Sequence, residues 1–172
     1  SKLKNKNKLM RKKVYVVFSA DFLHNGHIKI LKKASSLGKV IVGVLTDEAI
    51  STFKTIPLLS FEQRLLLFKN LKYVDEVIAQ KTLDYRPNLK KLKPEFVVHG
   101  DDWKKGVLKK TRLQVLAELK KWSGKLVEQR YTKNISSTEI RNQIYQVYKN
   151  KNNRTSFLKR LIKIKNIVRI VE

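Results

Sequence analysis

Two histidines lie three residues apart in the segment Ser19-Ala-Asp-Phe-Leu-His24-Asn-Gly-His27. The segment follows an apolar run and precedes a stretch with helical spacing, so we expect it to join a strand to a helix. Side chains at this spacing share one face of a first helical turn, where free backbone N–H groups attract phosphate. Imidazoles there can donate hydrogen bonds to a phosphorus centre as negative charge grows. The pattern therefore favours phosphate chemistry.

Two other interpretations of the pair remain open from the residues alone: a structural pair with satisfied hydrogen bonds, and part of a metal site. A metal site has little support because His99 is the third and last histidine and the chain has no Cys. The absence of Cys also excludes disulfides and favours the cytoplasm. The chain has neither an apolar run of about 18 residues nor the apolar stretch of a secretory signal, so we expect no membrane span.

Apolar runs typical of buried strands alternate with stretches of helical spacing. The expected strands cover 14–18, 40–45, 74–79, 94–99 and 125–128. The expected helices cover 27–37 (closed by Gly38), a start at 46–48, then 60–68, 87–92, 107–122 and a last one from Ser136. This alternation predicts an α/β fold with a Rossmann-like, doubly wound parallel sheet. Ligands in such sheets bind at the carboxyl ends of strands, which selects 19–27, 45–54 and 99–106, with 130–138 as a fourth candidate.

Composition divides the chain into three parts. Residues 1–13 are a basic extension, 14–148 can bury one full core, and 149–172 are a linker and the start of a following domain or of a basic helix. The net charge of +25 favours anionic partners in general. The terminal basic runs carry no RNA-binding motif, and we interpret them as solvated chain. Charge alone does not select a partner.

Further motifs follow the histidine pair in a fixed order. They are Thr46-Asp-Glu48, Glu62-Gln-Arg64, Tyr73-Val-Asp-Glu-Val77, Gly100-Asp-Asp-Trp103 and Ile135-Ser-Ser-Thr138. Over about residues 14–145, this order resembles the His-x-Gly-His nucleotidyltransferases, and among them the glycerol-3-phosphate cytidylyltransferases. The segments 43–50, 82–85, 97–104 and 131–138 are similar to the cytidylyltransferase domain fused to phosphoenolpyruvate mutase in phosphonate biosynthesis. The tail 158–172 is similar to the opening of a mutase domain, the alternative being an ordinary basic amphipathic helix.

The resemblance implies a role for each matched position. His24 and His27 would stabilise the α-phosphate of CTP during attack, and Lys54 would face the phosphates or the acceptor. The implied nucleotide-binding residues are Ser19, Ala20, Asp21, Gly26, Gly100, Asp101, Trp103, Ile135, Ser136, Ser137 and Thr138. Weaker candidates for the acceptor or phosphate are Arg64, Lys72 and Arg130. Arg64 could equally meet a structural acid. Asp21 matches a family Asp that helps to hold this loop and that could also assist metal binding, although no protein ligand to a metal is assigned.

The implied reaction transfers CMP from CTP to 2-hydroxyethylphosphonate or 2-aminoethylphosphonate, releases pyrophosphate and uses Mg²⁺ with the triphosphate. Glycerol 3-phosphate is the alternative acceptor. Tyr131 and Asn134 depart from the usual Arg and Gly of glycerol-phosphate relatives, which concerns acceptor recognition. A homodimer and a fused phosphoenolpyruvate mutase domain are the implied partners. An adenylyltransferase acting on another small phosphate ester and a basic nucleic-acid-binding module without turnover remain as alternatives.

Overall fold

The computed structural model describes residues 11–130, 132 and 135–149. Most of the predicted basic extension, the tail 150–172, Tyr131 and Asn134 lie outside the described residues. The linker, the following domain and the two departures in acceptor recognition therefore stay predictions. Within the described part, none of the helices combines the length and the apolar character needed to cross a bilayer.

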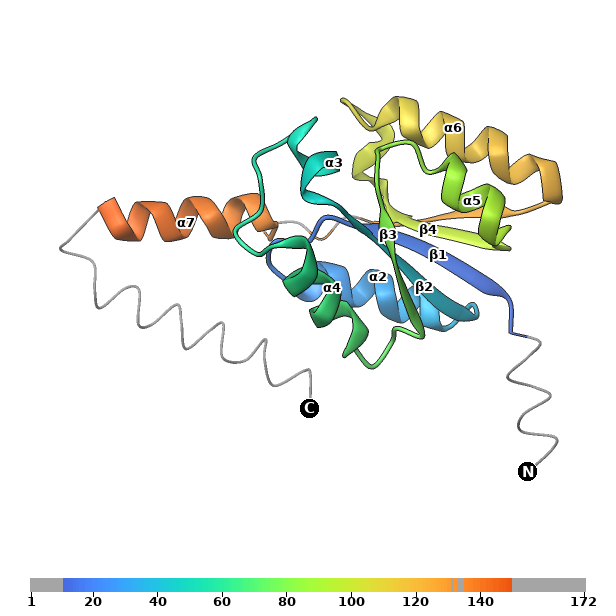
Figure 1. Ribbon diagram of the computed structural model, residues 1–172, viewed down its shortest axis with the longest axis horizontal. Helices are drawn as coiled ribbons and strands as arrows, with labels where there is room; N and C mark the ends of the chain where they lie inside the picture. Colours follow the sequence, from blue (N-terminus) through green and yellow to red (C-terminus); the bar gives the residue numbers. More distant parts are fainter. Residues whose placement is uncertain (1–10, 131, 133–134, 150–172) are drawn as a thin grey trace.

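Five parallel strands form one sheet in the order β3-β2-β1-β4-β5 (Figure 1). The strands are β1 (Lys13–Phe18), β2 (Lys39–Leu45), β3 (Glu76–Gln80), β4 (Phe96–Gly100) and β5 (Lys125–Gln129). All five predicted strands are present, and their bounds differ from the expected ones by no more than two residues. The order reverses direction at β1, which opens a crevice beyond the carboxyl ends of β1 and β4. The predicted doubly wound parallel sheet is confirmed.

Helices cover both faces of the sheet, with α2 and α4 against one face and α5 and α6 against the other (Figure 1). The helices are α2 (Asn25–Ser35), α3 (Asp47–Ser51), α4 (Phe61–Lys69), α5 (Arg86–Leu92), α6 (Lys109–Leu119) and α7 (Ser137–Lys149), with short 3₁₀ turns η1 (Asp101–Lys104) and η2 (Lys120–Trp122). The single helix expected over 107–122 is therefore α6 followed by η2. Helix α7 leaves the sheet at its carboxyl edge, so its first turn borders the crevice.

Strand β1 is buried on both faces, as its continuous apolar run predicts. Its alternate residues serve two cores: Val14, Val16 and Phe18 pack with α2 and α4, while Tyr15 and Val17 pack with α3, α5 and α6. Because both cores pack against β1, this strand is a rigid support for the residues that follow its carboxyl end.

The predicted role of Gly38 as the residue that closes the first helix is wrong. Helix α2 ends at Ser35, Ser36 is its C-cap, and Gly38 does not adopt the left-handed conformation of such a glycine. Instead, a Cβ at this position would lie 1.9 Å from the backbone oxygen of Lys12. Gly38 is therefore required where the chain entering β2 passes close to the chain entering β1.

Candidate active site

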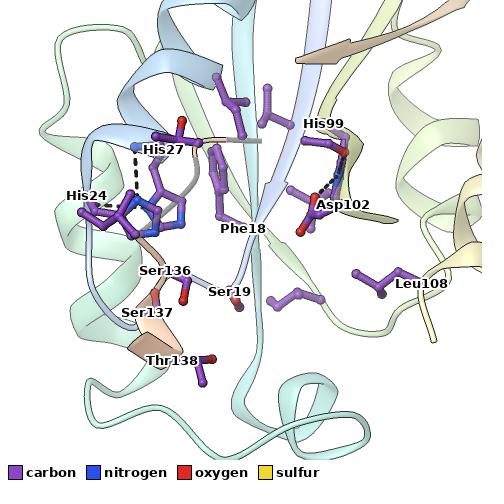
Figure 2. A pocket seen from close by; sticks show the side chains of 18 of the residues that line it. Phe18, Ser19, His24, His27, His99, Asp102, Leu108, Ser136, Ser137 and Thr138 are labelled. Atoms are coloured by element: carbon purple, nitrogen blue, oxygen red, sulfur yellow. Dashed lines mark hydrogen bonds and ion pairs between the residues drawn. The ribbon is translucent and has the colours of Figure 1, made fainter. Parts of the chain in front are cut away.

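A cavity of about 370 Å³ opens at the carboxyl ends of β1 and β4 (Figure 2). It brings together five segments that are distant in the sequence: the β1–α2 loop, the α3–α4 loop, the β3–α5 connection, the end of β4 with η1, and the segment leading into α7. Of the predicted site residues, the cavity is lined by Ser19, His24, Gly26, His27, Lys54, Gly100, Arg130, Ile135, Ser136, Ser137 and Thr138. The crevice expected from the strand order therefore contains most of the predicted site.

His24 and His27 are joined to each other through the start of α2. His24 is the N-cap, and its Nδ1 accepts a hydrogen bond from the Gly26 N–H at 3.1 Å. The His24 N–H donates to Nδ1 of His27 at 3.3 Å. A nitrogen that accepts a backbone hydrogen bond carries no proton, so the hydrogen of each neutral ring is on Nε2. Each histidine therefore has one N–H left to donate to a ligand.

Both imidazoles are kept neutral by their surroundings. Burial lowers the pKa of His24 to about 4. Burial is also the main cause that lowers the pKa of His27, and the positive charges that His24 and Lys54 can carry lower it further. The His27 ring packs edge-on against Phe18 and lies 3.9 Å from the His24 ring, centroid to centroid. At neutral pH the pair therefore offers hydrogen-bond donors rather than positive charges.

Gly26 leaves room for the His24 ring. A Cβ on Gly26 would lie 2.9 Å from Cε1 and Nδ1 of that ring, closer than such atoms approach in real structures. Any other residue would push the imidazole away from the helix start. The glycine between the two histidines therefore positions a side chain, and it also lines the cavity.

Lys54 and Ser19 are hydrogen-bonded to each other at the cavity. Nζ of Lys54 donates to Oγ of Ser19 at 2.6 Å, and both residues line the cavity. Burial is the main cause that lowers the pKa of Lys54. Lys54 is on the α3–α4 loop, where its backbone N–H bonds to the Ile50 carbonyl. A cation beside a hydroxyl at the end of β1 suits an anionic ligand.

The start of α7 forms another wall of the cavity. The hydroxyl of Ser136 accepts the Glu139 N–H at 3.0 Å, which is the cap predicted from the sequence. The Ser137 hydroxyl donates to the carbonyl of Phe22 at 3.1 Å and so ties this helix to the β1–α2 loop. Ser136 and Thr138 lie at the N-terminal end of α7, a helix of 13 residues, and a helix N-terminus favours anions.

Asp21 holds loops together and does not line the main cavity. Its Oδ1 accepts the N–H groups of Leu58 and Leu59 at 2.7 and 3.1 Å, and its Oδ2 forms an ion pair with Arg141. Both carboxylate oxygens are thus engaged, which favours the loop-holding interpretation of Asp21 over a metal ligand. Among the residues that the structure describes, no group of three or more His, Asp or Glu side chains is arranged to hold a metal ion.

Arg141 is a site residue that the sequence interpretation did not include. It lies one turn after Ser137 on α7, and with Ser19, Asp21, Lys54, Ser137 and Thr138 it lines a smaller cavity of about 110 Å³. Its guanidinium also donates to the Ile56 carbonyl at 3.1 Å. The available signal was spacing, because residues 137 and 141 share one helix face.

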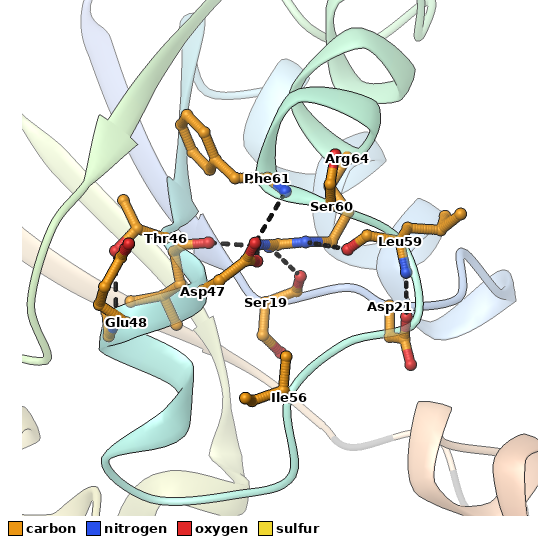
Figure 3. A network of polar contacts seen from close by, with 12 residues as sticks. Ser19, Asp21, Thr46, Asp47, Glu48, Ile56, Leu59, Ser60, Phe61 and Arg64 are labelled. Atoms are coloured by element: carbon orange, nitrogen blue, oxygen red, sulfur yellow. Dashed lines mark hydrogen bonds and ion pairs between the residues drawn. The ribbon is translucent and has the colours of Figure 1, made fainter.

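Arg64 is fully buried and fastens the carboxyl ends of β1 and β2 together (Figure 3). Its Nη1 donates to the carbonyls of Ser19 and Leu45 at 2.7 and 2.8 Å, and its Nη2 binds Asp47 at 2.6 Å. Its Nε donates to the Leu59 carbonyl at 3.2 Å. These contacts support the interpretation that Arg64 pairs with a structural acid, here Asp47, over the interpretation that it binds phosphate or the acceptor. Arg64 lines neither cavity.

Four other predicted residues also lie outside both cavities. Trp103 is fully buried, stacks on the His99 ring with centroids 3.7 Å apart, and donates from Nε1 to Glu128 at 2.8 Å. It supports His99 from behind. Ala20 turns the chain with a left-handed φ of 35°, which strains a residue with a Cβ. Asp101 and Lys72 line neither cavity, and Lys72 is exposed.

The cavity also has a wall that the sequence interpretation left unassigned. It is lined by Phe53, Tyr85, His99, Asp102 and Leu108. His99 and Asp102 lie at the end of β4, within the segment 99–106 that the strand rule selects. Burial is the main cause that lowers the pKa of His99, whose Nδ1 bonds to the Gly100 carbonyl at 2.8 Å. The cavity therefore combines one side whose hydrogen-bond donors and Lys54 suit an anion with another side that is partly aromatic.

Comparison with known proteins agrees with this arrangement. The chain is 36% identical over 100 residues to glycerol-3-phosphate cytidylyltransferase of Bacillus subtilis, covering 54% of this chain and 73% of that protein. It is 34% identical over 96 residues to ethanolamine-phosphate cytidylyltransferase of Arabidopsis thaliana, covering 52% of this chain and 23% of that protein. It is also 35% identical over 97 residues to FAD synthase of Methanopyrus kandleri, covering 54% and 65% of the two chains.

The chain thus spans less than a quarter of the plant relative's length and about two thirds of the archaeal one. The family match is broader than these pairwise matches. It covers residues 17–143, from the end of β1 into α7, and so includes every residue that lines the cavity except Val16. The chain therefore belongs to the cytidylyltransferase-like family.

Proposed function

We propose that the chain transfers CMP from CTP to a small phosphonate or phosphate acceptor and releases pyrophosphate. The observation that carries this proposal is the meeting of two neutral imidazoles, the Lys54–Ser19 pair and the start of α7 in one cavity. All three supply hydrogen-bond donors or positive charge to phosphate oxygens. The relatives named as cytidylyltransferases support the same reaction class.

The proposed reaction needs little acid–base chemistry from the protein. A phosphate monoester loses its second proton near pH 6, and a phosphonate has lost at least its first proton at neutral pH, so either kind of acceptor already offers an anionic oxygen as the nucleophile. One of its oxygens attacks the α-phosphorus of CTP in line. The bond from that phosphorus to the oxygen that bridges it to the β-phosphorus breaks, and pyrophosphate leaves with the electron pair. Catalysis then depends on positioning and on stabilising negative charge.

The side chains of the cavity divide these tasks. The Nε2–H groups of His24 and His27 donate to the α-phosphate oxygens, where negative charge grows. Lys54 and Ser19, together with Ser136, Thr138 and Arg141, bind the phosphates that become pyrophosphate. Mg²⁺ that arrives with the nucleotide would supply further neutralisation of the triphosphate. This cation-rich and hydroxyl-rich lining is suited to such a polyphosphate–metal complex.

The resemblance of 43–50, 82–85, 97–104 and 131–138 to the phosphonate subgroup is what supports our choice of acceptor. We propose 2-hydroxyethylphosphonate or 2-aminoethylphosphonate. Glycerol 3-phosphate and ethanolamine phosphate, the acceptors in the names of two relatives, are the alternatives. One relative is named FAD synthase, and FAD contains an adenylyl group, so ATP remains an alternative nucleotide. The homodimer, the fused mutase domain and the cytoplasmic location belong to the same proposal.

Pyrophosphate release tests the proposal directly. The protein is incubated with Mg²⁺, with CTP or ATP, and with each of the four acceptors, and pyrophosphate and the CDP-type product are quantified. Release that requires both CTP and an acceptor supports the proposal. Turnover with ATP alone among the nucleotides would make the protein an adenylyltransferase. No turnover and no CTP binding under any of these conditions would overturn the proposal.

The net charge of +25 favours a second candidate, a basic module that binds nucleic acid without turnover. Salt-sensitive binding to duplexes of unrelated sequence, with no pyrophosphate release, would identify such a module. This candidate assigns no task to the neutral His24–His27 pair or to the cavity. We therefore place it second.

A further inference from the structure

The two sides of the cavity differ in charge. His24 and His27 lie on one side of Phe18, and His99 and Asp102 lie on the other (Figure 2). The first side, with Lys54 and the α7 start, suits anions. Asp102 is the one carboxylate among the described residues that line this cavity. A carboxylate raises the free energy of an anionic ligand beside it, unless it faces a cationic part of that ligand.

Asp102 also differs from the neighbouring carboxylates in its partners. Those carboxylates are paired with arginine: Asp21 with Arg141, Asp47 with Arg64, and Glu128 with Arg112. Among the described residues, no Lys or Arg forms an ion pair with Asp102. Nδ1 of His99 is 3.9 Å away, too far for a hydrogen bond. That nitrogen already bonds to the Gly100 carbonyl, and burial disfavours a charge on the ring.

The position of Asp102 keeps its carboxylate at the cavity. Its side chain is 49% exposed and folds back over the end of β4, where a Cβ on Gly100 would lie 2.7 Å from Oδ1. Stacking of Trp103 on His99 holds the turn that carries it. The carboxylate is therefore presented to a ligand from a supported backbone.

The wall beside Asp102 suits a short carbon chain. Tyr85, Leu108 and Phe53 line it and pack in the same apolar cluster as Trp103. The charge of Asp102 acts on Tyr85, where it adds to the effect of burial in raising the pKa of that hydroxyl. Burial lowers the pKa of Lys54, and Asp102 acts on it at longer range to raise that pKa, so the two charges mark opposite sides of the cavity. An apolar surface next to a carboxylate that forms no ion pair with a described Lys or Arg matches a two-carbon chain that ends in an ammonium group.

We propose that Asp102 determines acceptor specificity by binding the ammonium group of a 2-aminoethyl phosphonate or phosphate. The proposal rests on the proposed function and deepens it, because it favours amino acceptors over hydroxyl acceptors. The anionic end of the acceptor faces His24 and His27, and its ammonium end lies at Asp102. The exocyclic amino group of cytosine is another donor that a carboxylate can bind, so the test separates the two sources.

The test compares kcat/KM for 2-aminoethylphosphonate and 2-hydroxyethylphosphonate, with CTP, in the wild type and in Asp102→Asn. We expect the wild type to prefer the amino acceptor and Asp102→Asn to lower that preference by about 10-fold or more, since a charged hydrogen bond is lost. Asp102→Glu should restore part of the preference. N-acetyl-2-aminoethylphosphonate, which has no positive charge, should lose the advantage of the amino acceptor in the wild type.

Glu62→Gln is the matched control, because Glu62 is an exposed acid that lines neither cavity. It removes the same charge and should keep the wild-type preference. An acceptor preference that Asp102→Asn leaves unchanged would overturn the proposal. So would a change confined to the ratio of CTP to UTP turnover, which would assign Asp102 to the base. An equal rise in the Mg²⁺ requirement for every acceptor would assign it to the metal.

Failure of the proposed function has a different signature. In that case wild-type protein releases no pyrophosphate with any acceptor, and the proposal for Asp102 falls with it. Turnover that shows no preference for the amino acceptor leaves the transferase standing and overturns the role of Asp102 alone.

Discussion

The imidazole of His27 accepts the backbone N–H of His24, while the imidazole of His24 accepts the N–H of Gly26 two residues further on. The nitrogens that build the helix start are thus different from those left for a ligand. Capping fixes the tautomer of each ring, and burial keeps the rings neutral. The structural and the proposed catalytic roles of the pair therefore belong to opposite sides of the same rings.

Replacing His24 with Asn should separate these two roles. An Asn side chain is a good N-cap and can accept the Gly26 N–H, but it has no group in place of Nε2–H. We expect kcat to fall about 100-fold while the melting temperature stays close to that of the wild type. Steady-state pyrophosphate release and thermal unfolding measure the two effects.

His24→Ala is the companion variant, because it removes both the cap and the donor. It should lose a similar factor in kcat and, in addition, about 1 kcal/mol of unfolding free energy. Wild-type turnover in either variant would contradict the role of His24 in the reaction. Equal stability of the two variants would contradict its role as a cap.

The pKa values of the histidines predict an unusual titration. Burial lowers the pKa of all three, that of His24 to about 4, so no imidazole should titrate near pH 6.5 in the folded protein. NMR of the imidazole C–H groups measures these midpoints directly. A group titrating near 6.5 and lost in His24→Asn would contradict this environment for His24.

The same pKa shift has a consequence for stability. The unfolded chain binds a proton at each histidine near pH 6.5, whereas the folded protein resists protonation until a lower pH. The unfolding free energy should therefore be highest above pH 6.5 and fall as the pH is lowered toward 4. Urea unfolding at a series of pH values measures this, and the fall should be smaller in His24→Asn.

Local spacing predicted the parts of the site that local geometry builds. Residues three apart at a helix start gave the His24–His27 arrangement, and Ser136 was recognisable as a cap because its partner, Glu139, is three residues away. Apolar runs without alternation indicated strands buried on both faces, and the parallel sheet followed from them. These inferences required no knowledge of how distant segments meet.

The remaining parts depend on contacts between segments that are far apart in the sequence. Asp21 and Arg141 are separated by 120 residues, and their ion pair forms only after α7 has packed beside the β1–α2 loop. Trp103 belongs to the same motif as Gly100, yet its ring points into the core and stacks on His99. Residue type alone does not distinguish a ring that lines a cavity from one that supports its wall.

Replacing Arg64 should lower the unfolding free energy strongly, although Arg64 lines neither cavity. Arg64→Met would leave the Ser19, Leu45 and Leu59 carbonyls and one side of Asp47 without their donor in a buried place. We expect a loss of about 3 kcal/mol or more in unfolding free energy, measured by urea denaturation. Lys72→Ala, at an exposed position outside both cavities, is the control and should change stability and kcat little.

Replacing Gly26 with Ala should lower activity without unfolding the protein. The added Cβ would lie 2.9 Å from the His24 ring and would move that ring, while alanine favours the helix by up to about 1 kcal/mol over glycine. We expect kcat to fall about 10-fold or more, with a melting temperature equal to or above that of the wild type.

Combining Gly26→Ala with His24→Asn gives the decisive comparison. If the alanine acts by displacing the His24 ring, it should have little further effect on kcat once that ring is gone. An undiminished effect in the double variant would show that Gly26 acts on the ligand directly instead.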